Sequence, residues 1–198
     1  MKIIIATQNP HKVEEIQDIA NLFNIHGIGF CPIDKSLNFN PVEDGKTFEE
    51  NSIIKAKEAN RLTKEYTLAD DSGLCVEALN GAPGIHSARY ADTAQKRIDK
   101  LLDAIKNETN RKAKFVCAMT LINPRGEIIF KATGECKGKI ALSQSGTHGF
   151  GYDPVFLVDG TDKTMADMTE AEKNRISHRS LALQQVFAFL ENNSYLPM

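Results

Sequence analysis

The chain opens with a short strand, a polar loop and a helix, and this order constrains the fold more than any other feature. Residues 2–6 form an apolar, β-branched run that gives way to Thr7 and ends before Pro10, as expected of a buried strand entering a loop. From Lys12 onward, apolar residues recur at helical spacing as far as Phe23. A strand that leads directly into a helix favours an α/β fold.

Similar signals predict the remaining elements. Helical spacing marks residues 47–61, 98–105 and 178–190, and strand-like stretches occupy residues 26–31, 66–69, 74–76, 114–122, 127–133 and 138–142. Two capping boxes, which pair Thr47 with Glu50 and Thr169 with Glu172, predict helix starts. Residues 123–126 are typical of a four-residue hairpin loop. Early strand–helix alternation followed by a hairpin predicts an α/β fold with a mixed sheet.

Composition narrows the class of protein. The 198 residues suit one large domain or two closely packed lobes. A net charge of -2 provides no general attraction for a nucleic acid polymer or an anionic membrane. The N-terminal apolar run is too short for a signal peptide, and no apolar run approaches the ~20 residues that span a bilayer. The 4 cysteines are far apart, so we expect neither zinc nor a disulfide framework, and we expect reduced thiols in strands of a cytoplasmic protein.

The loop between the first strand and the first helix could bind phosphate. It holds Thr7, Gln8, Asn9, Pro10, His11 and Lys12. A helix N-terminus carries unpaired amides and a partial positive charge, and hydroxyl, amide and ammonium groups would complete an anion site. The alternative is an ordinary helix cap followed by a solvated lysine. No G-x-x-x-x-G-K-[ST] motif occurs, which argues against a P-loop enzyme.

An acidic pair, Asp70 and Asp71, follows a strand-like run and precedes Ser72 and Gly73. Two neighbouring carboxylates repel each other unless a cation or hydrogen-bond donors offset their charge. Carboxylate oxygens together with substrate phosphates are ligands that Mg²⁺ prefers, and Glu43 could supply another. The alternative is a simple turn that ends the strand.

Two later segments could contact a ligand, and the first of them could stack on a base. In residues 146–153, glycines permit close approach of a ligand to the backbone, and Phe150 and Tyr152 offer faces for stacking. Inward packing of these aromatic rings is the alternative.

The second segment holds Lys173, Ser177, His178 and Arg179. Ser177 is a plausible helix N-cap, and cations in the first helical turn oppose the helix dipole, which hints at an anionic or acceptor partner. An exposed Arg–His pair is the alternative.

Together, in this order, these segments resemble the inosine triphosphate pyrophosphatase family. Thr7, Asn9 and Lys12 match its Thr/Ser-x-Asn-x-x-Lys motif; residues 70–74, 81–84 and 87–90 match Asp-Asp-Ser-Gly-Leu, Gly-Ala-Pro-Gly and Ser-Ala-Arg-Tyr; residues 150–154, 172–173 and 177–179 match Phe-Gly-Tyr-Asp-Pro, Glu-Lys and Ser-His-Arg. The match covers nearly the whole chain.

The resemblance implies a two-lobed α/β fold, with a long mixed sheet flanked by helices and the active site in the cleft between the lobes. Residues 1–198 would form a single domain, usually present as a homodimer. The family hydrolyses the α–β anhydride of non-standard purine nucleoside triphosphates (ITP, dITP, XTP) with Mg²⁺. The products are the monophosphate and pyrophosphate.

Roles for individual residues follow from the same resemblance. Substrate would be bound by residues 7–12, and its phosphates by Thr7, Asn9, Lys12 and Lys55. The catalytic carboxylate would be Asp71, which would hold Mg²⁺ and act as general base, and Ser72 would contact the substrate.

The purine would stack on Phe150, in a pocket lined by Gly151, Tyr152 and Asp153. Its edge would be read, or its pocket supported, by Lys173, His178 and Arg179. Donors from His178 and Arg179 would favour a 6-oxo over a 6-amino purine.

The second metal carboxylate departs from the family pattern. Its usual place, three residues before Gly45, is occupied by Val42, and Glu43 is the nearest substitute. We also considered a pyrimidine triphosphate pyrophosphatase, against which the purine-pocket segments argue. A nucleotide-binding regulatory module without catalysis is the non-enzymatic alternative, against which the intact Asp70, Asp71 and Ser72 argue.

Overall fold

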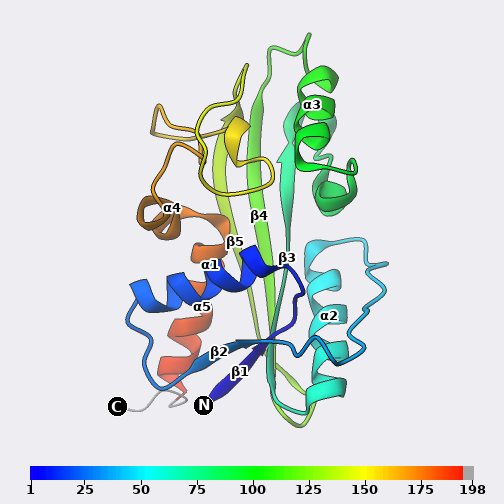
Figure 1. The fold of residues 1–198 in the computed structure, drawn as a ribbon, viewed down its shortest axis with the longest axis vertical. Coiled ribbons are helices and arrows are strands. Elements are labelled where there is room, and N and C mark those ends of the chain that lie inside the picture. Colours follow the sequence, from blue (N-terminus) through cyan, green and yellow to red (C-terminus); the bar gives the residue numbers. More distant parts are fainter. Residues whose placement is uncertain (194–198) are drawn as a thin grey trace.

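A computed structural model describes residues 1–193 and is built on one six-stranded sheet (Figure 1). The strands are β1 (Lys2–Ile5), β2 (Gly29–Pro32), β3 (Tyr66–Val76), β4 (Lys112–Ile122), β5 (Ile128–Ile140) and β6 (Phe156–Val158), in the order β2-β1-β3-β4-β5-β6. β1 pairs in parallel with β2 and β3, whereas the other pairs are antiparallel. The predicted α/β class with a mixed sheet is therefore confirmed.

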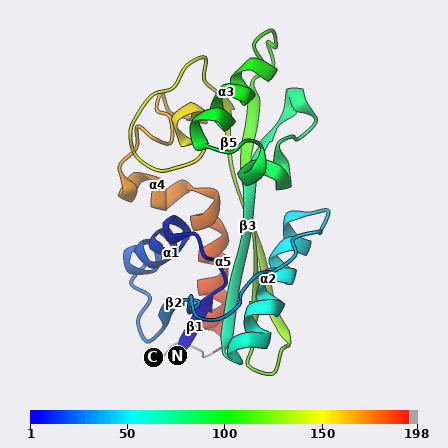
Figure 2. The same cartoon turned by 45° about the vertical axis from the view of Figure 1, so that its right-hand side comes forward.

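Helices cover both faces of this sheet. They are α1 (Pro10–Leu22), α2 (Phe48–Thr63), α3 (Ala94–Ala104), α4 (Glu170–Ile176) and α5 (His178–Asn192). Figures 1 and 2 show α1 and α5 on one side of the sheet and α2 on the other, with α3 near the far end of the long strands. Within the described residues, no helix combines the length and apolarity needed to cross a bilayer.

The molecule has two lobes and three apolar cores, two cores in the lobe around β1 and one in the other lobe. One core lies between α1, α5 and the sheet around Ile16 and Val186, and a second lies under α2 around Ala59. A third core, around Leu101 and Phe156, packs the other end of the long strands. Strands β3, β4 and β5 run through both lobes. The single domain expected over residues 1–198 stays a prediction, and residues 194–198 lie outside the described range.

The predicted break in the third strand is wrong. β3 continues without interruption through Asp70 and Asp71, which pair with Met119 and Ala118 of β4. Side chains of successive strand residues point to opposite faces, so the two carboxylates meet separate sets of cations and need not end the strand. Similarly, the two strands predicted at residues 127–133 and 138–142 are one strand, β5, because the ladder with β4 does not lapse between them.

Local signals at the helix ends were more reliable. Thr169 and Glu172 form the complete capping box predicted for α4. Thr47 caps α2 as expected, but Glu50 accepts from the amide of Lys46 instead of that of Thr47. Asn9 caps α1, which starts at Pro10, two residues before the predicted start. The cysteines are free and lie in strands β2, β3, β4 and β5, as predicted.

Candidate active site

A cavity of about 560 Å³ collects segments from both lobes. Its walls include the loop before α1, the stretch that precedes α2, the middle of β3, and the starts of the loop and helices that follow residue 150. Every predicted site residue lines it except Pro10 and His11: Thr7, Gln8, Asn9, Lys12, Glu43, Lys55, Asp71, Ser72, Phe150, Gly151, Tyr152, Asp153, Lys173, His178 and Arg179 do so. The fold thus brings together segments that are far apart in sequence.

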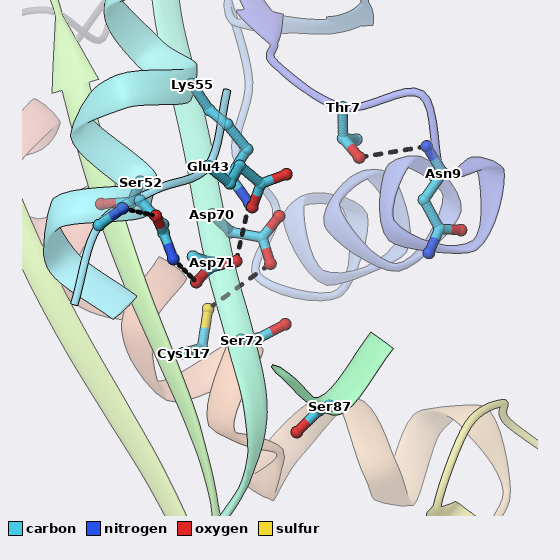
Figure 3. Close-up of polar contacts among 12 residues, drawn as sticks. Thr7, Asn9, Glu43, Ser52, Lys55, Asp70, Asp71, Ser72, Ser87 and Cys117 are labelled. Carbon is cyan, nitrogen blue, oxygen red and sulfur yellow. Dashed lines mark hydrogen bonds and ion pairs between the residues drawn. The ribbon is translucent and has the colours of Figure 1, made fainter. Parts of the chain in front are cut away.

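The loop before α1 is organised around the helix N-terminus (Figure 3). The Oγ1 of Thr7 accepts from the amide of Asn9 at 3.1 Å, and the Oδ1 of Asn9 accepts from the amide of His11 at 3.0 Å. Pro10 occupies the first helical turn, where its missing N–H costs no hydrogen bond. The amides of Asn9 and His11 are taken by these side chains, so what the loop offers a phosphate is the positive end of the helix dipole together with the Lys12 ammonium.

Gln8 has a structural contact as well as a place in the cavity wall. Its Nε2 donates to the carbonyl of Phe39 at 3.1 Å. This bond ties the loop before α1 to the irregular segment that carries Glu43. The sequence pattern alone gave no sign of this link, because it joins two loops 31 residues apart.

The two aspartates have different surroundings. Asp70 is 2% exposed and does not line the cavity. Its Oδ2 accepts from Lys12 at 2.9 Å and from Arg179 at 3.1 Å. Burial favours the neutral acid, but Lys12, Arg179 and Lys55 outweigh it and hold the pKa of Asp70 well below its usual range. Asp70 is therefore a fixed anion that holds two cations in place.

Asp71 faces α2 and the cavity instead. Its Oδ1 accepts from Nζ of Lys55 at 2.8 Å, and its Oδ2 accepts from Nδ2 of Asn51 at 3.3 Å. Burial raises the pKa of Asp71 above its usual value, although Lys55 and Lys12 lower it. Between the two carboxylates, Asp71 is thus the better proton acceptor, because it retains basicity and is open to the cavity.

Glu43 joins the Asp71 cluster through the same ammonium. Nζ of Lys55 lies 3.1 Å from its Oε2, so the two carboxylates converge on one point (Figure 3). Burial opposes the charge of Lys55, but Asp70, Asp71 and Glu43 outweigh it and raise its pKa. Within residues 1–193, no group of three or more His, Cys, Asp or Glu side chains could hold a metal ion by itself. A cation here would complete its coordination with water or with substrate phosphates.

The other end of the cavity is aromatic. Phe150 lines it, and Nζ of Lys173 lies 5.0 Å from the centre of the Phe150 ring. Oδ2 of Asp153 accepts from Nζ of Lys173 at 2.8 Å and from the Phe150 amide at 3.0 Å, which fixes both groups. The Tyr152 hydroxyl donates to the carbonyl of Ser87 at 2.9 Å. This end can stack a flat ring and donate a hydrogen bond to its edge.

Arg179 and His178 are buried at the start of α5. The guanidinium of Arg179 donates from Nη1 to Glu15, and from Nη2 to Asp70 and to Oγ of Ser72. Both Nη atoms are therefore occupied by protein acceptors, whereas the buried Nε has no hydrogen-bond partner among residues 1–193. His178 stacks on Phe115 with 4.8 Å between ring centroids, and burial together with Arg179 keeps its pKa well below 6.5. The imidazole is thus neutral at pH 7.

His11 lies outside the cavity. Its ring stacks on Phe150, with 5.3 Å between centroids and 16° between planes. Because His11 borders the smaller neighbouring hollow and Phe150 borders both, the Phe150 ring separates the two spaces. His11 is therefore positioned to support the aromatic wall of the cavity from behind.

Several wall residues were not predicted as site residues. They are Ala6, Phe39, Asn40, Pro41, Gly73, Ile85, Ser87, Ala88, Arg89, Arg97 and Phe115. Gly73 packs so closely on the carbonyl of Gly84 that an added Cβ would lie 2.3 Å from that oxygen. Ser87 and Arg89 belong to a recognised motif, which could have marked them, whereas Arg97 and Phe115 carry no local signal.

Comparisons with known proteins identify the family. A family model for the Ham1 family matches residues 3–189. A dITP/XTP pyrophosphatase of Treponema denticola is 41% identical over 98% of this chain and 100% of its own, and one of Clostridium perfringens is 45% identical over 93% and 95%.

Solved structures of Ham1 proteins have the same fold as this chain. The Ham1 protein of Staphylococcus aureus superposes with a TM-score of 0.86 at 40% identity, covering 98% of this chain and 100% of its own. A HAM1 protein from Coxiella burnetii also reaches 0.86, at 38% identity over 97% and 99%. The sequence matches and the fold agree over almost the whole chain. The chain therefore belongs to the Ham1 family.

Proposed function

We propose that the protein hydrolyses non-standard purine nucleoside triphosphates (ITP, dITP and XTP) to the monophosphate and pyrophosphate, and so cleanses the nucleotide pool. One observation carries this proposal: one cavity has a helix N-terminus, Lys12, Lys55 and the Asp71 carboxylate at one end, and Phe150 with Lys173 at the other. Relatives named dITP/XTP pyrophosphatases support the same substrates.

The proposed chemistry depends on positioning and charge. Water attacks the α-phosphorus, a new P–O bond forms, and the bond from the α-phosphorus to the bridging oxygen breaks, so that pyrophosphate leaves. Asp71 takes the proton from the attacking water, because burial raises its pKa and it lines the cavity. A bound cation would lower this pKa again, so the role of base requires that Asp71 holds the cation only weakly. The phosphates are held by Thr7, Asn9, Lys12 and Lys55. Ser72 contacts the substrate between its phosphates and its purine.

Asp71 and Glu43 fit a divalent cation. Both carboxylates reach the Lys55 ammonium, at 2.8 and 3.1 Å, so their oxygens already converge on one positive charge. Mg²⁺ prefers one or two carboxylates completed by water and substrate phosphates, which suits a site without a third acidic ligand. When bound, Mg²⁺ would neutralise charge that develops on the phosphates. Glu43 thus takes the place of the carboxylate expected at Val42.

Selectivity for the base rests on donors at the Phe150 end. A lysine ammonium has three donors; Glu15 and Asp153 engage the Lys173 ammonium, which also borders the cavity. A 6-oxo purine offers an acceptor there, whereas a 6-amino purine offers a donor. A buried mismatch of this kind costs ~1–3 kcal/mol. Gly151, Tyr152 and Asp153 shape the pocket, and neutral His178 supports it.

Two competing functions predict a different substrate preference or no turnover. A pyrimidine triphosphate pyrophosphatase would prefer smaller bases, which leave part of the Phe150 face uncovered. A regulatory module would bind nucleotide without turnover. Cytoplasmic location and a homodimeric state remain expectations of the family resemblance.

The experiment is a substrate panel with Mg²⁺ in which pyrophosphate and orthophosphate are measured separately. We expect pyrophosphate from ITP, dITP and XTP at rates well above those for ATP and the pyrimidine nucleotides. Asp71→Asn should abolish turnover with the fold intact, whereas Asp103→Asn, at an exposed site on α3, should not. Near-normal rates for Asp71→Asn, or orthophosphate as the main product, would sink the proposal.

A further inference from the structure

Glu15, on α1, is a buried carboxylate to which the proposed reaction assigns no role. Its side chain is 13% exposed and lies behind the cavity wall. Burial raises the pKa of an acid, but Arg179 and Lys173 outweigh this and lower the pKa of Glu15 to about 2. At neutral pH, Glu15 is therefore an anion enclosed by the protein.

Each oxygen of Glu15 holds a different cation of the cavity wall. Oε1 lies 2.5 Å from Nζ of Lys173, and Oε2 accepts from Nη1 of Arg179. Lys173 stands beside Phe150, whereas Arg179 donates to Ser72. One carboxylate thus contacts a cation at the aromatic end and a cation at the centre of the cavity.

The charges continue in alternation on both sides of Glu15. Lys173 pairs with Asp153 at 2.8 Å, Arg179 pairs with Asp70 at 3.1 Å, and Asp70 pairs with Lys12 at 2.9 Å. The resulting series of buried charges is Asp153, Lys173, Glu15, Arg179, Asp70 and Lys12. It runs from the base end to the phosphate end, and its two halves meet at Glu15.

Stability alone is a poor explanation for such a series. The cost of removing charges from water offsets much of the attraction between buried ion pairs. A lysine ammonium is a point charge on a flexible stem, so its direction must be fixed by its partners. Lys173 has two carboxylate partners in these contacts, Glu15 and Asp153, and without Glu15 it would keep only Asp153. Orientation is therefore what Glu15 supplies.

We propose that Glu15 is a positioning residue that aims Lys173 at the edge of the purine and Arg179 at Asp70 and Ser72. The inference rests on the proposed function and deepens it, because it makes base selectivity depend on a residue that does not line the cavity.

The test compares Glu15→Gln with Glu14→Gln. Glu14 is the next residue back on α1, but its side chain is 69% exposed and 3.8 Å from His11. Glutamine keeps the shape of glutamate but removes the charge and turns one acceptor into a donor. The quantity measured is kcat/KM for ITP divided by kcat/KM for ATP. We expect this ratio to fall about tenfold or more in Glu15→Gln, because this is the effect of losing one hydrogen bond between charged groups. The ratio should stay unchanged in Glu14→Gln.

An unchanged ratio in folded Glu15→Gln overturns the inference, even if both rates fall, because equal loss indicates a structural role only. If Glu15→Gln does not fold, Glu15→Asp decides on the same ratio. Aspartate keeps the charge but is shorter, so we expect a smaller fall, and an unchanged ratio again overturns the inference. A wild-type protein that releases no pyrophosphate from ITP would instead count against the proposed function.

Discussion

Replacing Lys55 with methionine tests whether Asp71 and Glu43 form a cation site. The ammonium lies 2.8 Å from Asp71 and 3.1 Å from Glu43, with 9% of the lysine side chain exposed. At an effective dielectric constant of about 20, each attraction is worth about 5–6 kcal/mol before desolvation is subtracted. Removing one partner of a buried pair costs ~3–5 kcal/mol net. Glu43 is 31% exposed and contributes less.

We therefore expect Lys55→Met to lower the melting temperature by on the order of 10 °C for a chain of this length. Added Mg²⁺ should then raise the melting temperature of the variant more than that of wild type, because the ammonium no longer competes for the same oxygens. The assay is thermal unfolding followed by circular dichroism, with and without Mg²⁺. It needs no substrate, so it tests the site independently of turnover.

Lys131→Met is the matched control. Lys131 pairs with Glu49 at 2.7 Å, but both side chains are about half exposed, and such pairs contribute only about 0–1 kcal/mol. A loss in Lys55→Met no larger than in the control would refute the view of Lys55 as a buried counter-ion. Equal Mg²⁺ responses in Lys55→Met and wild type would refute the shared cation site.

Three further predictions concern other parts of the molecule. Gly73→Ala should lower the urea midpoint through a loss of about 1–3 kcal/mol in the free energy of unfolding, the usual cost of overpacking, because its Cβ would lie 2.3 Å from the Gly84 carbonyl oxygen; a wild-type midpoint would contradict this. The pKa of Glu15 is lowered from 4.5 to about 2, so its stabilisation should be complete above pH ~4.5 and lost as the pH falls toward 2; urea unfolding should show a flatter acid limb in Glu15→Gln, and identical limbs would argue against it. His11→Ala should raise KM for ITP by roughly two- to tenfold with little change in kcat, since the Phe150 stack is lost; His11→Phe should restore KM, and failure to do so would exclude stacking as the cause.

Local signals predicted the parts of the site that depend on neighbouring residues. Asn9 and Pro10 are typical of a helix start, and the structure has both at the start of α1. The position of this loop at a helix N-terminus could therefore be predicted from the sequence, and its binding of phosphate stays a prediction. The same holds for the Thr169 capping box that begins α4 and so places Lys173.

Charge pairs between residues far apart in the chain could not be predicted from the sequence. The pair Asp70 and Asp71 suggested the end of a strand, because the cations that stabilise it come from α1, α2 and α5. Glu15 looked like any polar residue of an amphipathic helix, since its partners lie more than 150 residues away in the chain, at Lys173 and Arg179. Such pairings become visible only once the fold has brought the elements together.

The position of bond cleavage tests the central claim most directly. Hydrolysis of ITP in ¹⁸O-labelled water, followed by mass spectrometry of both products, reports which phosphorus the water attacks. We predict that the label enters inosine monophosphate and that pyrophosphate stays unlabelled, because water attacks the α-phosphorus next to Asp71. Label in pyrophosphate would place the attack at the β-phosphorus and contradict the account.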